Sequence, residues 1–502
     1  MIRFLFVLSC LFTSHFVTAQ ICGTPQMPLL ERVDINKKIM LIQERGALKY
    51  IPITFHLVAN SNGTGRVQEE DVFRQLCNLN AQYADQDVIF YIDRLNYFDN
   101  TTVFETPASS AATTQMRLRK DGNSINVYIT NKADSGNGGP GETLAYYDPQ
   151  EDWIVSKKNQ INGVGKSLAH ELGHFFSLPH PHAGWDCYPY TDEDYGNPIT
   201  VDFTIPCDGG GGSTQIELQN GSNCATAGDR ICDTPPDYNI GLLHQSGCSP
   251  NNSIKDKNGQ VITPIVTNIM SYYMDCETNN FTQTQKNLMN TDFFTIQRSY
   301  IRTGKVPETD TVTGPVNYIT PINGQLTPGD TDIFLDWEDV PNATHYLVII
   351  DRFQSFTFNP EKFFVTESEL FIDSLALLSN YYWKVWPYNE SRTCAGYSAT
   401  QNFTVGLETA VKEISDLNGY ILSPNPIRSN AVATLTLTTT RNFDAVLSIS
   451  DATGHVFTKE TVEISEGVTQ YPLQTNGLPG GIYFIMLHTD IGVMVERLMI
   501  IE

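Results

Sequence analysis

Three histidines and one glutamate in the middle of the chain have the spacing of a catalytic metal site. The segment reads His170-Glu171-Leu172-Gly173-His174, and His180 stands six residues beyond the second histidine. Residues i and i+4 share one face of a helix, so His170 and His174 can direct two imidazole nitrogens at one tetrahedral zinc ion. Glu171 lies about 100° around that helix, where it can take a proton from a metal-bound water instead of ligating. The pattern predicts hydrolysis by a zinc-activated water, with Glu171 as the general base.

Two histidines compete for the place of third ligand, because the chain continues as Pro179-His180-Pro181-His182. One helix cannot carry a third ligand on the same face at this distance, so the chain must turn away after Phe176. Pro179 is consistent with a helix that ends there. We expect His180 to be the ligand on spacing, and His182 remains the alternative.

The metal helix needs elements that hold it, and the apolar pattern indicates them. One face of this helix is apolar at helical spacing and should be buried; its residues are Val164, Leu168, Leu172, Phe175 and Phe176. Upstream, the segments 50–58, 88–92 and 125–130 favour strands, and an apolar pattern over 72–83 favours a helix. Helices packed on a sheet are therefore expected around the site.

The histidine spacing resembles the metzincin metalloproteases, whose signature HExxHxxGxxH is followed by a distant methionine turn. The chain departs from it at Ser177, where the family has a glycine whose backbone conformation costs other residues about 1 kcal/mol or more. The segment Asn268-Ile269-Met270-Ser271-Tyr272-Tyr273-Met274-Asp275-Cys276 resembles the methionine turn of the pappalysin, or cytophagalysin, branch. Residues 228–235 resemble that branch too, and the resemblance spans roughly residues 46 to 300.

This resemblance implies an α+β metzincin-like catalytic domain over residues 46–302 with one catalytic zinc ion. Met270 would form an apolar floor beneath the metal, and Tyr272 would direct its hydroxyl at the scissile carbonyl. The Gly136–Gly141 loop and the strand Leu144–Tyr147 would bind an extended peptide, antiparallel, by strand addition.

A calcium ion is also expected from this resemblance. Asp229, Asp233 and Thr234 are hard oxygen donors with a compatible spacing, and members of the branch bind calcium. The alternative is a solvated turn. These residues belong to an insertion rich in acidic, aromatic and glycine residues, including Gly209 to Gly212.

The N-terminus has the features of a secretory signal peptide over residues 1–19. A basic residue, an apolar run and the small residues before Gln20 predict cleavage after Ala19. A lipoprotein signal centred on Cys10 is the alternative. No later apolar run is long enough to span a membrane, so we expect no transmembrane segment in the mature protein.

Cleavage there leaves an odd number of cysteines in an oxidising compartment. Cys22, in a prosegment over residues 20–45, stands next to a glycine and resembles a cysteine switch, in which the thiolate is a latent-state zinc ligand. The alternative is a disulfide with Cys77, and Cys77 and Cys394 have no evident partners. Six cysteines between the zinc helix and the methionine turn favour disulfides over a second zinc site: Cys187, Cys207, Cys224, Cys232, Cys248 and Cys276.

The rest of the chain predicts further domains and an exported protein. With 502 residues and a formal net charge of −24, the chain should hold several domains and is a poor partner for nucleic acid or anionic membranes. Residues 303–318 are predicted to be a linker, and 319–406 resemble a fibronectin type III domain that serves either as a spacer or in substrate adhesion. Residues 412–502 resemble the C-terminal sorting domain of type IX secretion. This resemblance implies export through the periplasm of a Gram-negative, Bacteroidetes-like bacterium, to the medium or the cell surface, with the secretion machinery as partner.

The predicted fold class is therefore multidomain, with an α+β metzincin-like catalytic domain followed by two all-β sandwich domains. The predicted function is a secreted zinc-dependent endopeptidase that hydrolyses protein or peptide bonds. The alternative is a catalytically weak secreted adhesin that retains the metalloprotease fold. The intact set of His170, Glu171, His174, His180 and Met270 favours the enzyme.

Overall fold

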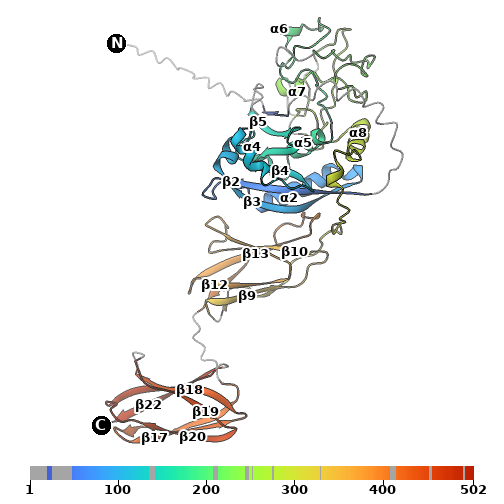
Figure 1. Cartoon of the computed structure of the whole chain (residues 1–502). Coiled ribbons are helices and arrows are strands. Elements are labelled where there is room, and N and C mark those ends of the chain that lie inside the picture. Colours follow the sequence, from blue (N-terminus) through green and yellow to red (C-terminus); the bar gives the residue numbers. More distant parts are fainter. Residues whose placement is uncertain are drawn as a thin grey trace, which may run out of the picture.

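The computed structural model of the chain contains three units that follow one another along the sequence (Figure 1). It describes residues 20–24, 48–134, 142–206, 213–243, 248–250, 253–273, 276–327, 329–406, 414–451, 455–489 and 492–501. The predicted signal peptide, most of the prosegment, the Gly136–Gly141 loop and Gly209–Gly212 lie outside these residues.

The first unit, residues 20–24 and 48–301, is built on one six-stranded sheet. Its strands, in spatial order, are β1 (Gln20–Cys22), β5 (Glu142–Asp148), β6 (Trp153–Lys157), β4 (Ile125–Thr130), β2 (Lys49–Ala59) and β3 (Val88–Asp99). β2, β3, β4 and β6 are parallel neighbours, whereas β5 runs antiparallel to β6. β2 is buried from Ile51 to Ala59, as expected of a strand covered on both faces.

Helices cover both faces of this sheet. On one face, α2 (Glu69–Gln82) and α5 (Ser167–Phe175) share a core with β2, and α8 (Gln283–Phe293) joins it. On the other face, α3 (Thr101–Glu105) and α4 (Ser110–Arg117) pack on a second cluster. The remaining short helices of the unit are η2 (Ala84–Gln86), η3 (Lys158–Gln160), α6 (Asp192–Tyr195), α7 (Ile240–Leu243) and η4 (Ser299–Ile301).

The predicted apolar face of the metal helix is buried except at one residue. Leu168, Leu172, Phe175 and Phe176 are buried, but Val164 is 80% exposed and precedes the helix. The prediction for Val164 is wrong because Asn162 begins a tight turn. Its side-chain oxygen accepts hydrogen bonds from the backbone N–H groups of Val164 and Gly165, at 3.0 and 3.1 Å, and helical hydrogen bonding starts only afterwards.

The second unit is a two-sheet sandwich. One sheet has the order β11-β10-β13-β14-β8 and the other has the order β12-β9-β7. The bounds are β7 (Tyr318–Thr320), β8 (Gln325–Thr327), β9 (Thr331–Trp337), β10 (His345–Asp351), β11 (Glu361–Val365), β12 (Glu369–Ser374), β13 (Asn380–Tyr388) and β14 (Gln401–Val405). Trp337 and Trp383 are buried between the sheets.

The second unit is joined to the first by a disulfide and by a shared core. Cys77 of α2 is bonded to Cys394, so the alternative pairing of Cys77 with Cys22 is wrong. Among the described cysteines Cys22 is free. Phe73 of α2 packs against Trp386 and Tyr388 of β13, with ring centroids 5.7 and 4.5 Å away.

The third unit is a second two-sheet sandwich, with sheets β15-β17-β20 and β16-β22-β21-β18-β19. Its strands are β15 (Leu417–Ser423), β16 (Ile427–Arg428), β17 (Val432–Thr439), β18 (Phe443–Asp451), β19 (Val456–Ile464), β20 (Gly467–Gln474), β21 (Gly481–His488) and β22 (Val493–Ile501). Alternating inward residues such as Leu435 and Leu437 of β17 and Ile485 and Leu487 of β21 form its core.

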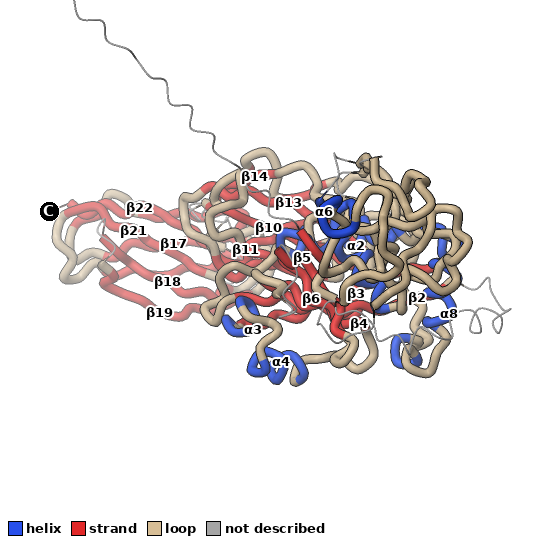
Figure 2. Tube along the Cα trace, turned by 90° about the horizontal axis from the view of Figure 1, so that it is seen from above, coloured by secondary structure: helices blue, strands red, loops and turns tan. Residues whose placement is uncertain are grey.

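The predicted fold class, led by an α+β metzincin-like catalytic domain, is wrong. The chain is mostly β-sandwich, with 36% of residues in strands and 15% in helices. The physical reason is that the zinc motif determines only one nine-residue helix. The long segment between α5 and α8 contributes almost no regular structure, and Figure 2 shows it as loops around α6.

Candidate metal centre

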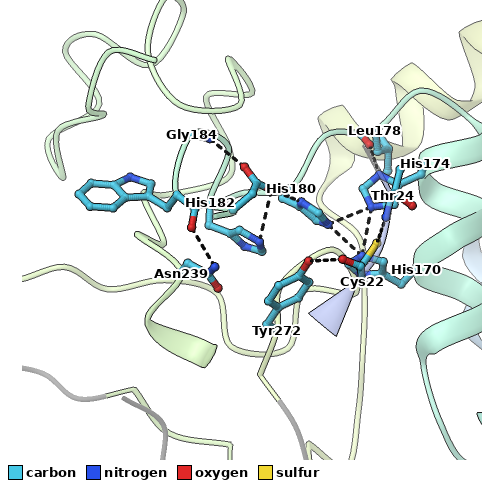
Figure 3. Close-up of polar contacts among 12 residues, drawn as sticks. Cys22, Thr24, His170, His174, Leu178, His180, His182, Gly184, Asn239 and Tyr272 are labelled. Atoms are coloured by element: carbon cyan, nitrogen blue, oxygen red, sulfur yellow. Dashed lines mark hydrogen bonds and ion pairs between the residues drawn. The ribbon is translucent and has the colours of Figure 1, made fainter. Parts of the chain in front are cut away.

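Three imidazoles converge at the C-terminal half of α5 (Figure 3). The Nε2 atoms of His170 and His174 are 3.1 Å apart, and the Nε2 atom of His180 lies 3.1 and 2.9 Å from them. Ligand nitrogens of a tetrahedral zinc ion, each about 2.0–2.1 Å from the metal, are about 3.3 Å apart. The three nitrogens therefore lie close to the positions that one zinc ion needs.

The other ring nitrogens show why a cation fits this arrangement. The Nδ1 atom of His170 donates to the carbonyl of Ile269 at 2.9 Å, and that of His174 donates to the carbonyl of Leu178 at 2.8 Å. The Nδ1 atom of His180 lies 2.5 Å from Asp186 Oδ1. With every Nδ1 proton donated outward, three Nε2 lone pairs face one another without a proton between them. A cation at their centre would resolve this arrangement.

Burial keeps the two helix histidines in the state that a metal requires. Burial, followed by the neighbouring imidazoles, holds the pKa of His170 and of His174 well below the ordinary value of 6.5. Metal ligands must be neutral imidazoles. Both histidines are therefore ready to ligate across the physiological pH range.

A cysteine sulfur lies beside the three imidazoles. The Sγ atom of Cys22 and ligand nitrogens of the three histidines all lie within 4.8 Å of one another. Burial and the Glu171 carboxylate raise the pKa of the Cys22 thiol well above its ordinary range. A bound divalent ion reverses this effect, because it stabilises the thiolate. A set of one thiolate and three imidazoles has the donor composition of a closed tetrahedral zinc site.

Cys22 reaches the cluster because its strand adds to the sheet. β1 pairs in parallel with the edge strand β5, with Gln20 opposite Glu142 and Cys22 opposite Ala145. The backbone N–H of Gly23 continues the ladder by donating to the carbonyl of Ala145 at 2.8 Å. The segment therefore occupies the edge that a peptide strand would need.

The general-base candidate, Glu171, is covered by the same segment. Its Oε2 atom accepts a hydrogen bond from the Thr24 hydroxyl at 2.7 Å and contacts the Cys22 Sγ at 3.5 Å. The Thr24 hydroxyl also accepts from the backbone N–H of Tyr147 at 2.8 Å, which ties it to β5. Burial raises the pKa of Glu171 to about 7. Sequence reasoning missed Thr24, although it stands only two residues after the cysteine.

The predicted methionine turn, described over residues 268–273, contacts the histidines. Met270 is fully buried, and a Cβ built on Gly173 would lie 2.3 Å from the Met270 sulfur. A side chain at position 173 of α5 would therefore require the buried Met270 side chain to shift. The ring of Tyr272 packs against His180, and its hydroxyl donates to the backbone carbonyl of Cys22 at 3.4 Å. Tyr272 thus directs its hydroxyl at a main-chain carbonyl that lies in the cleft.

Ser177 adopts the conformation that favours glycine, and its side chain is anchored. Its φ is +69°, in the left-handed region. Its hydroxyl donates to Asp292 of α8 at 3.0 Å, and Asp292 also accepts from Arg298 at 2.9 Å. This hydrogen bond offsets part of the backbone strain. The arm from α5 to His180 is therefore held from α8.

His182, the alternative third ligand, stands outside the cluster of Cys22 and the three other histidines. Its ring stacks on that of His180 with centroids 4.4 Å apart and an interplanar angle of 11°. It is fully buried, and neither ring nitrogen has a hydrogen-bond partner within the described residues.

The predicted calcium ligands make hydrogen bonds at two separate places, a turn and the start of a helix. Asp229 accepts from the backbone N–H of Ile231 at 2.8 Å and from the Thr234 hydroxyl at 2.7 Å. Asp233 instead caps the start of α8, where it accepts from the Thr282 hydroxyl and the Thr284 N–H, both at 2.8 Å. Calcium binding at Asp229, Asp233 and Thr234 stays a prediction.

The prediction of disulfides in this region is confirmed for the described cysteines. Cys224 is bonded to Cys232, and Cys248 is bonded to Cys276. Cys187 is also disulfide-bonded. These bonds leave no thiolates at the described positions for the second zinc site that was the alternative.

Comparison with known proteins bears on the C-terminal unit. Residues 422–501 match the family of secretion system C-terminal sorting domains. This domain indicates export by type IX secretion to the outside or the surface of a Bacteroidetes-like bacterium, with the secretion machinery as partner. Among the described residues, no helix combines the length and apolar character needed to cross a lipid bilayer.

The other comparisons leave the metal centre without a matching family. A search of curated proteins gave no match. One similar solved structure is that of the chicken CNTN1 FN1-FN3 domains, which is 15% identical over 39% of this chain and 70% of that chain, with a TM-score of 0.18. The assignment of the metal centre therefore rests on its own geometry.

Proposed function

We propose that this exported chain is a zinc-dependent endopeptidase that is made in a latent form. The observation that carries the proposal is the set of three Nε2 atoms within 2.9–3.1 Å of one another, each on a ring whose Nδ1 proton is donated outward. The motif resemblance of the His170 and Met270 segments to pappalysins is part of this proposal and supports the same chemistry.

The residues around the site fit the steps of peptide hydrolysis. A zinc ion held by His170, His174 and His180 would supply Lewis-acid polarisation and a water of lowered pKa. Glu171 lies one residue along the helix from the first ligand and takes the proton of the attacking water, then returns it to the leaving amine. Tyr272 donates its hydroxyl hydrogen bond to the substrate carbonyl oxygen, as it does to the Cys22 carbonyl.

The edge of β5 is the proposed binding site for the peptide. Without β1, the outer edge of β5 offers unpaired backbone groups that an extended substrate can bind by strand addition. A substrate would run antiparallel to β5, whereas β1 runs parallel to it. The segment around Cys22 therefore lies in the cleft in the reverse direction, which blocks the site without presenting its own peptide bond for cleavage.

A cavity beside Cys22 is suited to a substrate side chain. It has a volume of about 80 Å³ and lies between β5, the start of α5 and the methionine turn. Lys166 lines it and donates to the carbonyls of Asn268 and Ser271 at 3.2 and 2.8 Å. This small, partly polar cavity favours a short side chain next to the cleaved bond.

Casein hydrolysis by the processed protein tests the proposal. We expect about one zinc per chain by elemental analysis, hydrolysis that a chelator abolishes, and recovery when zinc is returned. Glu171→Ala is the matched control, since it should bind zinc and not hydrolyse casein. A processed wild-type protein that binds zinc but cleaves neither casein nor a peptide library would contradict the proposal.

A further inference from the structure

His180 differs from the other two ligand candidates in what holds its ring. His170 and His174 belong to α5, and their Nδ1 atoms donate to backbone carbonyls. His180 stands on the loop after the helix, and its Nδ1 atom faces the carboxylate of Asp186 at 2.5 Å. No helix therefore fixes the His180 ring. Its Nδ1 partner is a carboxylate, whereas the Nδ1 partners of His170 and His174 are backbone carbonyls.

Asp186 is itself held in place. Its second oxygen, Oδ2, accepts from the backbone N–H of Gly184 at 3.0 Å. Gly184 has φ +94°, and a Cβ there would lie 2.6 Å from the side chain of Thr214, so the tight turn requires glycine. The loop after His180 therefore folds back and brings the Asp186 carboxylate against the His180 ring.

His182 packs against the pair formed by His180 and Asp186. Its ring lies flat on His180, and its Nε2 atom is 3.9 Å from Asp186 Oδ1, too far for a hydrogen bond. It also packs against Tyr272, with centroids 4.4 Å apart. The stacked ring covers one face of the His180 imidazole and hinders its rotation.

We propose that Asp186 is a positioning residue for the metal centre: it holds the Nδ1 proton of His180 and so directs the Nε2 lone pair at the metal. The inference rests on the proposed zinc site. A carboxylate partner fixes the tautomer, restricts ring rotation and makes the imidazole a stronger donor. In this arrangement His182 contributes by packing.

Zinc affinity of the full-length chain tests this role, measured by competition with a chromophoric chelator. Loss of such a partner typically weakens metal binding by roughly 10- to 100-fold, and we expect this for Asp186→Ala. Asp186→Asn should lie between, because an amide oxygen can still accept from Nδ1 but carries no charge. His182→Phe, which keeps a flat ring, should bind zinc as the wild type does.

Two controls separate positioning from simple folding. Asp202→Asn removes another carboxylate of the same loop region, one that pairs with Lys257 on the surface, and should not change zinc affinity. The thermal midpoint of the zinc-free protein should be nearly unchanged in Asp186→Asn, and its cobalt-substituted form should show a shifted visible absorption spectrum.

The results distinguish this inference from the proposed function. If the wild type binds no zinc, the proposed function fails. If the wild type binds zinc and both Asp186 variants bind it equally tightly, the positioning role is overturned. If Asp186→Asn weakens zinc binding only as far as it lowers the stability of the zinc-free protein, Asp186 is structural and the inference fails as well.

Discussion

The contacts that hold the latent state can be removed one by one by substitution, and Thr24 provides the most specific test. Thr24→Val keeps the shape of the side chain but removes the hydroxyl that donates to Glu171 at 2.7 Å and accepts from the Tyr147 N–H. Cys22→Ala removes the sulfur from the metal cluster instead. Thr24→Val therefore frees the general-base candidate Glu171, whereas Cys22→Ala frees the fourth metal position.

The size of the Thr24 effect follows from the kind of hydrogen bond. Above its pKa of about 7 Glu171 is charged, and a hydrogen bond to a charged group contributes about 1.5–3 kcal/mol, which corresponds to a rise of about 10- to 150-fold in the population with the segment released. Several contacts remain, including the β1–β5 pairing and the Tyr272 bond to the Cys22 carbonyl. We expect Thr24→Val to leave residual latency and Cys22→Ala to show activity before any processing, with the double variant the most active.

The assay is hydrolysis of a quenched fluorescent peptide by the unprocessed chain, compared with the same chain cut at about Lys49. The cut chain sets full activity for each variant. Thr114→Val is the matched control, because its hydroxyl bonds only within α4, to the Ser110 carbonyl at 2.9 Å. If the unprocessed wild type were as active as the cut chain, the chain would not be latent. If the unprocessed double variant were inactive while its cut form was active, contacts other than these would maintain latency.

Three further outcomes are expected. Glu171→Ala should retain zinc near one per chain and lose hydrolysis, as read by elemental analysis and casein cleavage; unchanged cleavage would remove Glu171 from the mechanism. His180→Ala should weaken zinc binding strongly and His182→Ala only slightly, and the reverse order would make His182 the ligand. Burial lowers the pKa of His56 from 6.5 to about 4, so the unfolded chain binds this proton first as the pH falls. The contribution of buried, neutral His56 to the free energy of unfolding is complete above pH 6.5 and falls by roughly 3 kcal/mol between pH 6.5 and about 4. Urea unfolding midpoints measured across this range should fall less for His56→Gln than for the wild type. Parallel curves for the two proteins would contradict the assignment.

The features that depend on local spacing were accessible from the sequence. His170 and His174 share a helix face because of helical geometry alone, and a cysteine followed by glycine near the N-terminus suggested where a fourth ligand could come from. Met270 and Tyr272 followed from a motif in which sequence neighbours lie on one turn. In each case the relevant distance along the chain is short, or a motif encodes it.

The features that depend on tertiary folding were not accessible. Asp186 partners His180 only because the turn at Gly184 folds the loop back, and no periodicity signals such a turn. The Cys77–Cys394 bond joins residues 317 positions apart. The fold class failed for a related reason: one short metal helix is compatible with many surroundings, so the motif says little about how much of the chain forms sheets.

The second unit contacts α2, the helix that lies between the sandwich and the candidate metal centre. Tyr83, just after α2, donates its hydroxyl to the carbonyl of Ala169 in α5 at 3.0 Å. On its other side, the α2 segment bonds to the sandwich: the Thr393 hydroxyl donates to the Phe73 carbonyl at 2.6 Å, and Asn80 donates to the Ser391 carbonyl at 3.1 Å. A plain spacer, the simplest interpretation of the sequence, would need none of these contacts. Because α2 is fixed to the sandwich by a disulfide and buried hydrogen bonds, the sandwich restrains the helix that contacts α5, which carries His170 and His174.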